Sequence, residues 1–217
     1  MVKTKDYQYG FTIVELLIAT TVFSVVLIGM VSAVLYISET FISGSVRSQT
    51  QSTARSIEQK ISQEIQLGST VTPATSNGSF VCIGDNKYSY TLNKELDTGS
   101  SSSAAPLVVQ NVSNCGTGTE TITPGPSTEL LGNHMRLGKF DVEFLGNGLY
   151  SIDIIIGYGD ALSSLDASQN GSLGWTTKVV NGITSYYYYC HNSIVFGEFC
   201  AATDLSTAVQ KRVNNGN

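Results

Sequence analysis

The strongest pattern in the chain is an apolar run close to its amino terminus. Residues 11–37 carry no charged side chain except that of Glu15. A helix of this length rises about 40 Å, which is enough to cross a hydrocarbon core of about 30 Å. The segment before it is short and polar, with Lys3 and Lys5 against Asp6. We expect residues 11–37 to form a membrane-spanning helix whose basic amino-terminal side stays in the cytoplasm.

A second helical pattern follows the membrane segment without a break. Apolar or small residues recur at spacings of three or four, while most charged residues fall elsewhere around the helix. This pattern predicts an amphipathic helix over residues 38–67, continuous with the first and ending near Gly68, with Gly44 and Ser45 as a point where it can bend. The whole helix would measure about 85 Å. The recurring positions are Val46, Thr50, Ala54, Ile57, Ile61 and Ile65.

The remainder, residues 68–217, is rich in Ser, Thr, Gly, Asn and Tyr and has the alternation of strands. The clearest element is a hairpin of residues 139–145 and 149–156, joined by a turn at Gly146-Asn147-Gly148. Weaker strand signals lie at 80–83, 88–92, 107–112, 176–180 and 185–190. We therefore predict an α+β fold in which an antiparallel sheet packs on the apolar stripe of the long helix.

Loops and one further helix complete the expected head. Clusters of Ser, Gly, Pro and Asn predict loops at residues 98–105, 116–129 and 160–174. The stretch 201–213 suggests a short helix that starts at Asp204, with Lys211 and Arg212 complementing the dipole at its end. The expected divisions are thus a leader (1–10), a membrane helix (11–37), its amphipathic continuation (38–67) and a single head (68–217).

Glu15 is the residue of the apolar run that needs explanation. A carboxylate at membrane depth costs several kcal/mol, so it needs a partner or a function. One interpretation is that Glu15 snorkels from the end of an ordinary signal anchor. A cleaved secretory signal peptide does not fit, because its apolar region is shorter and its cleavage site follows that region.

The residues around Glu15 resemble a known signal. Together with the short basic leader and the uninterrupted apolar helix, they are similar to the class III signal of type IV prepilins and pseudopilins. By this resemblance, the prepilin peptidase cleaves between Gly10 and Phe11, and Phe11 becomes the N-methylated amino terminus. Glu15 then matches the assembly glutamate, which pairs with the Phe11 amine of an adjoining subunit. The matching residues are Gly10, Phe11, Thr12, Glu15, Leu16 and Leu17.

The resemblance, which covers about the first 45 residues, implies a structural subunit of a type IV pilus or related filament. The partners would be other pilin subunits, the prepilin peptidase and an inner-membrane assembly platform. The subunit would be a single-pass precursor in the cytoplasmic membrane, with its head outside, before it enters a cell-surface filament. Many major pilins carry a proline where Ser32 stands here, which favours a minor pilin or a pseudopilin. The presence of Glu15 places the subunit beneath another one rather than at the outermost cap.

Two other classes of protein share some of these features. A membrane-anchored binding protein would use the helix only as a tether, and a tethered enzyme would need catalytic residues in the head. The sequence contains no Gly-x-Ser-x-Gly elbow and no His-Glu-x-x-His motif, so we expect no catalytic site. The net charge of −5 becomes −6 without the leader, and no specific nucleic-acid binding is predicted.

Four cysteines, all in the expected head, allow three disulfide connectivities. We expect Cys82–Cys115 and Cys190–Cys200, since sequential closure is simplest and hairpin-like strands flank both pairs. Four free thiols are the alternative in a host without an oxidising pathway. No metal or other cofactor is predicted. His134 and His191 do not complete a zinc pattern, and residues 166–171 imitate half of a calcium loop without the glutamate at its twelfth position.

Overall fold

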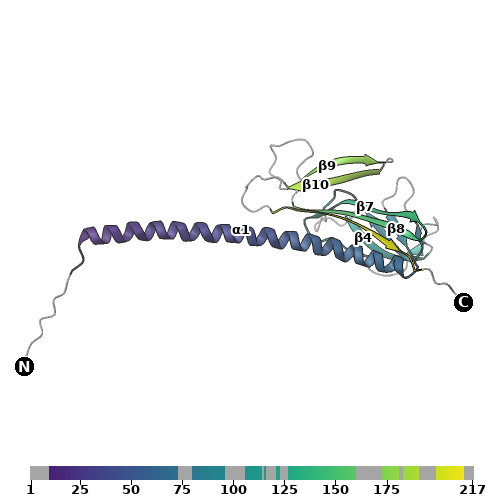
Figure 1. Cartoon of the computed structure of the whole chain (residues 1–217), viewed down its shortest axis with the longest axis horizontal. Coiled ribbons are helices and arrows are strands. Elements are labelled where there is room, and N and C mark those ends of the chain that lie inside the picture. The colour runs from purple at the N-terminus through teal and green to yellow at the C-terminus, as the bar shows by residue number, and fades with distance from the viewer. Residues whose placement is uncertain are drawn as a thin grey trace, which may run out of the picture. The chain divides into compact units, whose positions relative to one another are not determined.

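A computed structural model of the chain describes residues 10–72, 80–95, 106–113, 115, 121–122, 127–159, 173–180, 183–190 and 199–212. The architecture is α+β, with one long helix, α1 (Ile13–Gln66), and antiparallel strands, which confirms the predicted fold class (Figure 1). The chain divides into two compact units, Met1–Ile42 and Ser43–Asn217. The leader, helix and head boundaries expected from the sequence stay predictions.

Within the first unit, α1 is apolar and exposed. All side chains described from Phe11 to Ile42 are exposed, and by length and composition the helix can cross a membrane. Five hydroxyl groups of this segment donate to helix carbonyls three or four residues earlier, which satisfies them without water. These bonds run from Thr20 to Leu17, Thr21 to Ile18, Ser24 to Thr20, Ser32 to Ile28 and Thr40 to Tyr36.

Within the second unit, α1 buries one stripe in the core of the head. The helical assignment continues through Gly44 and Ser45 and ends at Gln66. Gly68 follows with a φ of 90°, and its amide donates to the carbonyl of Ile65 at 3.0 Å, which satisfies a terminal carbonyl of the helix. The six positions of the predicted stripe are all buried: Val46, Thr50, Ala54, Ile57, Ile61 and Ile65.

The strands form three antiparallel sheets. The first has the order β1-β2-β3-β4-β5, with β6 also paired to β4, and the second has the order β11-β8-β7. The third is the hairpin of β9 (Leu173–Val180) and β10 (Ile183–Cys190). The first sheet contains β1 (Val71–Thr72), β2 (Phe80–Ile83), β3 (Asn86–Tyr90), β4 (Leu107–Ser113), β5 (Thr121–Ile122) and β6 (Thr128–Glu129). The second contains β7 (Met135–Gly146), β8 (Leu149–Tyr158) and β11 (Ala201–Gln210).

The main core lies between the α1 stripe and the first two sheets. Ile152, Ile154 and Ile156 of β8 are completely buried in it, and Phe140 and Val142 of β7 lie beside them. The predicted hairpin with its turn at residues 146–148 is therefore confirmed as β7–β8. The predicted alternation fails at its end, because Phe144 is 59% exposed and contacts Tyr150 at the tip of the hairpin instead.

The prediction of a helix over residues 201–213 is wrong. Residues 201–210 form strand β11, which pairs with β8 along its full length. Side chains on β11 alternate between buried or half-buried and exposed positions from Ala201 to Gln210, as expected for a strand with one face on a core. Lys211 and Arg212 nevertheless lie at a helix carboxyl terminus, that of α1. The Arg212 amide donates to the carbonyl of Gln66 at 3.3 Å, where positive charge complements the dipole of α1.

Two predicted loops also contain strand. The stretch 116–129 includes β5 and β6, and β9 begins at Leu173 inside the stretch 160–174. The remainder of that second stretch up to residue 172, and residues 98–105, lie outside the described residues. Short strands of two residues leave little trace in a sequence, because alternation needs at least four residues to be visible.

The β9–β10 hairpin covers the face of the second sheet that does not face α1. Ile155 points to this face and packs with Leu173 and Tyr188 in a small second core, and Figure 1 shows β9 and β10 as a separate layer beside β7 and β8. The close approach depends on two glycines. A Cβ atom at Gly157 would lie 2.7 Å from the Tyr188 ring, and one at Gly138 would meet the Tyr186 carbonyl.

A half-buried carboxylate, that of Glu64, links α1 to the first sheet. Glu64 Oε1 accepts hydrogen bonds from Asn86 Nδ2 and Tyr88 Oη, each at 2.9 Å. Glu64 Oε2 is buried without a hydrogen-bond partner in the structure. Burial raises the pKa of Glu64 above its ordinary value, although the bond from Tyr88, the charge of Lys60 and the bond from Asn86 act in the opposite direction.

Replacing Gly157 by alanine tests how tightly the hairpin packs. We expect Gly157→Ala to lower the free energy of unfolding by about 1–3 kcal/mol, because the new methyl group displaces the Tyr188 ring. Urea unfolding of the full chain in non-ionic detergent, followed by the fluorescence of Trp175, measures the change. Gly132→Ala is the control, since its Cβ would meet only Met135 atoms at 3.8 Å or more. Equal unfolding midpoints for the two variants would contradict the packing described here.

The raised pKa of Glu64 predicts a pH dependence of stability. The folded head binds the Glu64 proton more tightly than the unfolded chain does. This contribution to stability is therefore complete below about pH 4.5 and is lost as the pH rises through the folded-state pKa. Glu64→Gln removes it, so the free energy of unfolding of the variant should rise relative to wild type between pH 4 and pH 7. The exposed Glu143, changed to glutamine, serves as the control. If the difference in the free energy of unfolding between wild type and Glu64→Gln did not vary with pH, the raised pKa of Glu64 would be refuted.

Candidate processing and assembly site

The first turn of α1 is closed by two side chains of the apolar segment. Glu15 Oε2 accepts hydrogen bonds from the Thr12 amide at 3.3 Å and from Thr12 Oγ1 at 3.2 Å. The Glu15 amide in turn donates to Thr12 Oγ1 at 3.3 Å. This reciprocal arrangement, with threonine before the first helical residue and glutamate three positions later, is a capping box.

The capping box gives Glu15 a role within its own chain. Its carboxylate lies beside the positive end of the helix dipole, where an anion is stabilised. The sequence interpretation missed this role, although the spacing Thr-x-x-Glu at residues 12–15 is the signal for it. The structure therefore brings Thr12 and Glu15 together. The expected pairing of Glu15 with the Phe11 amine of a second subunit stays a prediction, because the structure contains a single chain.

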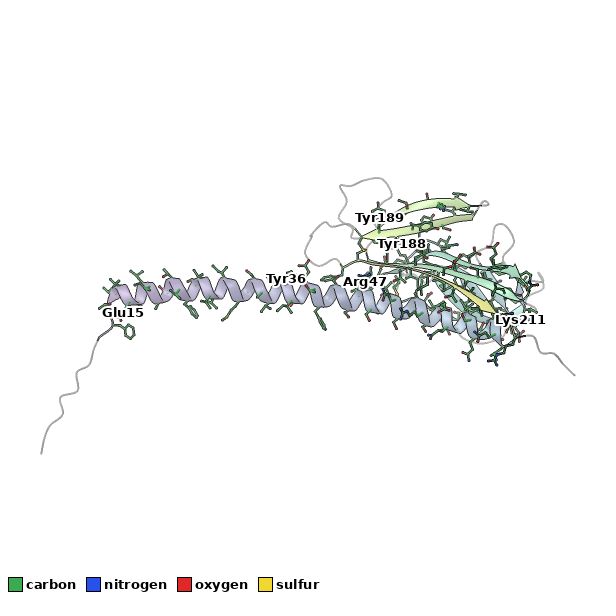
Figure 2. The ribbon with its side chains drawn as sticks, viewed as in Figure 1. Glu15, Tyr36, Arg47, Tyr188, Tyr189 and Lys211 are labelled. Atoms are coloured by element: carbon green, nitrogen blue, oxygen red, sulfur yellow. A yellow bond between two sulfur atoms is a disulfide. The ribbon has the colours of Figure 1, made fainter. Side chains whose placement is uncertain are left out.

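The expected scissile bond precedes the capped helix. Gly10, Phe11 and Thr12 lie before the first residue of α1, and the Phe11 side chain is 81% exposed. Space around Gly10 is open, since a Cβ there would have nothing within 4 Å. Figure 2 shows Glu15 at the beginning of α1, among side chains that project from all sides of the helix. Cleavage between Gly10 and Phe11 would create an amine one residue before the cap.

Two disulfides fasten the strands of the head. Cys82 of β2 is joined to Cys115 with a Cα–Cα distance of 5.7 Å, and Cys190 of β10 to Cys200 with a distance of 5.6 Å. These are the two pairs expected from the sequence. The first fastens the segment after β4 to β2, and the second fastens the end of the β9–β10 hairpin to the residue before β11. All four cysteines are used in this way.

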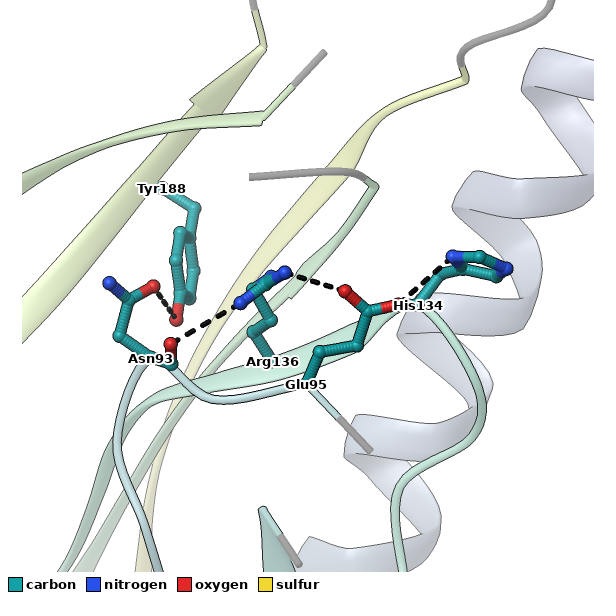
Figure 3. Close-up of polar contacts among 5 residues, drawn as sticks. All are labelled: Asn93, Glu95, His134, Arg136 and Tyr188. Carbon is teal, nitrogen blue, oxygen red and sulfur yellow. Dashed lines mark hydrogen bonds and ion pairs between the residues drawn. The ribbon is translucent and has the colours of Figure 1, made fainter. Parts of the chain in front are cut away.

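A polar cluster joins three segments of the head (Figure 3). Arg136 lies 2.5 Å from Glu95, and Glu95 lies 3.1 Å from His134 Nδ1. Arg136 Nη1 also donates to the Asn93 carbonyl at 3.3 Å, and Tyr188 Oη donates to Asn93 Oδ1 at 3.3 Å. Burial raises the pKa of Tyr188, so its hydroxyl stays protonated as the donor.

This polar cluster has the composition of a structural clamp. It connects the segment after β3 to β7 and β10. In the described part of the chain, no group of three or more His, Cys, Asp or Glu residues could hold a metal ion. His191 and the half calcium loop at residues 166–171 lie outside the described residues.

Comparison with known proteins identifies the amino-terminal segment. Residues 5–31 match the family model for the prokaryotic N-terminal methylation motif. The match contains the expected scissile bond, Phe11, Glu15 and much of the apolar part of α1. Together with that long apolar helix, it is consistent with a prepilin signal of the type IV pilin kind. No curated protein and no solved structure matched the chain.

The motif indicates a class of protein. It supports a subunit of the type IV pilin or pseudopilin type, made as a membrane-anchored precursor. Such a motif serves a structural role rather than catalysis, and it implies assembly with other subunits of this type and processing by a prepilin peptidase.

Proposed function

We propose that this chain is a structural subunit, of the minor kind, in a type IV pilus or a related filament. The prepilin peptidase cleaves the precursor after Gly10, Phe11 is N-methylated, and the subunit assembles through residues 11–37. The observation that carries this proposal is the methylation motif at residues 5–31, which coincides with the start of an exposed apolar helix.

The exposed half of α1 supports assembly in two successive environments. Large apolar side chains surround this half, and water is an unfavourable solvent for all of them. The lipid bilayer covers them in the precursor, and the helices of adjoining subunits cover them in the filament. The inner-membrane assembly platform then acts as the partner that moves the subunit from one environment to the other.

Glu15 supplies the specific contact of this assembly. Cleavage gives Phe11 a cationic amine, which in a low-dielectric filament core needs an anion within a few ångströms. The carboxylate of an adjoining subunit is the anion available in the apolar segment. Its bonds to Thr12 hold it at the helix start before assembly, so the side chain is already oriented at the end that meets the neighbour.

Two residues favour a minor position in the filament. Ser32 stands where many major pilins carry a helix-bending proline, and its hydroxyl donates to the Ile28 carbonyl at 2.8 Å within an uninterrupted helix. Glu15, which the outermost subunit of such filaments commonly lacks, places the chain beneath another subunit. A pseudopilin of a secretion or DNA-uptake system would assemble in the same manner.

Substitution of Glu15 separates its charge from its capping role. Glu15→Gln keeps an acceptor for the Thr12 amide but removes the charge, whereas Glu15→Ala removes both. We expect both variants to enter sheared filaments at least tenfold less than wild type, because an unpaired buried amine costs about 3–5 kcal/mol. Immunoblots of the filament fraction, normalised to the amount in the membrane, measure this.

The matched control for that experiment is Thr12→Val, which removes the cap but keeps the charge, and which should still enter filaments. If Glu15→Gln entered filaments as wild type does while Thr12→Val failed, the carboxylate would serve only as a helix cap.

A further inference from the structure

Within the described residues, four long strands of the head, β7, β9, β10 and β11, have an edge with no partner strand in their sheet. Among the described residues, β9 pairs only with β10, and β11 pairs only with β8. An unpaired edge presents a row of main-chain N–H and C=O groups that can accept another strand. Such a row is complemented by an extended polypeptide, because only a strand offers donors and acceptors at the same spacing.

The edge of β7 is protected, whereas that of β9 is open. The main-chain bridge between Glu95 and Arg136 occupies part of the β7 edge, and β10 is covered where its Tyr186 carbonyl lies against the face of β7 at Gly138. Lys139 of β7 is already paired with Asp141 of the same strand and with Asp153 of β8, so these charges are not free to pair with an added strand.

The outer part of β9 is suited to strand addition. Residues 176–180 are exposed on both faces of the hairpin, unlike Leu173 and Gly174 at its base. Four of these five residues, Thr176, Thr177, Val179 and Val180, are β-branched, which favours an extended conformation. A two-stranded hairpin gains stability from a third strand, so an added strand is energetically useful here.

The two edges carry opposite charges. Lys178 is the single charged residue of β9, and Asp204 is the single charged residue of β11. Both side chains are exposed, and neither makes an ion pair within the part of the chain that the structure describes. Opposite charges placed directly across a strand pair stabilise it, and they also set its register.

We propose that β9 of one copy adds to the free edge of β11 in a second copy, antiparallel, with Lys178 opposite Asp204. In this register all eight residues of β9 face β11, from Leu173 opposite Val209 to Val180 opposite Ala202. Every strand pair described in the head is antiparallel, which favours this direction.

A contact between two different edges is heterologous, so it does not close into a symmetric dimer and can join those copies of this chain that are neighbours in a filament. This inference rests on the proposed function and adds a contact between heads to the assembly through α1. A pair of β9 edges would instead close into a dimer and place the two hairpins symmetrically.

Engineered cysteines test the contact in intact filaments. All four native cysteines are in disulfides, so only the engineered cysteines have free thiols that can form new cross-links. We expect Lys178→Cys combined with Asp204→Cys to give a ladder of oligomers on non-reducing gels after mild oxidation, and either substitution alone to give none. A dimer from Lys178→Cys alone would overturn the proposal in favour of paired β9 edges.

The direction of the strands is tested by a second pair of variants. Thr176→Cys with Ser206→Cys should also give a ladder, because these positions are opposite in the antiparallel register. Thr176→Cys with Ala202→Cys, which would be opposite only in a parallel pair, should not. The reverse result would overturn the stated register.

Charge reversal in the Thr176→Cys, Ser206→Cys background tests the role of the ion pair. Lys178→Glu or Asp204→Lys alone should lower the ladder yield several-fold, and the two together should restore it. Glu143→Lys, on β7, is the matched surface control and should leave the yield unchanged. If neither charge reversal changed the yield of cross-linked oligomers, the pairing of Lys178 with Asp204 would be contradicted.

Filament content is measured in the same samples, which separates the two proposals. A chain that is present in sheared filaments but gives no ladder overturns the head contact alone. A chain that is absent from filaments overturns the proposed function and the head contact with it.

Discussion

The buried stripe of α1 is the contact on which the head depends. Between Val46 and Ile65 the helix gives one face to a core that it shares with the first two sheets, and Ala54, Ile61 and Ile65 are completely buried there. Glu64 adds a polar connection to β3 beside this stripe. Loss of the stripe would remove the common surface on which two separate sheets pack, so the head could not form around the sheets alone.

The same helix has a second surface that folding leaves uncovered. From residue 11 to residue 42 it offers mainly apolar side chains on every side, interrupted by Glu15, Glu39 and hydroxyl groups, several of which bond to its own backbone. A helix of this kind needs lipid or other helices around it. The methylation motif at its start fits a membrane-anchored precursor of the pilin type.

Glu15 connects the local structure to the proposed assembly. In the single chain its carboxylate caps α1 through Thr12, a role that requires only the helix itself. In the proposed filament it neutralises the amine of an adjoining Phe11. The two roles use the same position, because the positive end of a helix and the amine created by cleavage lie at the same end of the subunit.

Periodicity made much of the fold predictable from the sequence. The α1 stripe repeats every three or four residues over twenty positions, and the β7–β8 hairpin has a turn of glycine and asparagine between two alternating strands. At β11 the signals conflicted. Asp204, Lys211 and Arg212 imitate the ends of a helix, while the period of two from Ala201 to Val209 indicates a strand. The ten-residue partner offered by β8 decides the outcome, and partners far away in the sequence are invisible to local patterns.

The candidate site was predictable to the extent that it is local. The roles of Gly10, Phe11 and Glu15 follow from the resemblance to the prepilin signal and stay predictions, whereas the capping bond between Thr12 and Glu15 could be expected from their spacing. The layer formed by the β9–β10 hairpin was not predictable, because it depends on Gly138 and Gly157 leaving space for residues some thirty to fifty positions away. The edges of β9 and β11 became visible only when the sheets were known.

The mass of the intact subunit from sheared filaments tests the central claim most directly. The account predicts a chain that begins at Phe11, carries one additional methyl group there and lacks four hydrogens because of its two disulfides. A subunit that began at Met1, or that had lost the apolar helix, would contradict it.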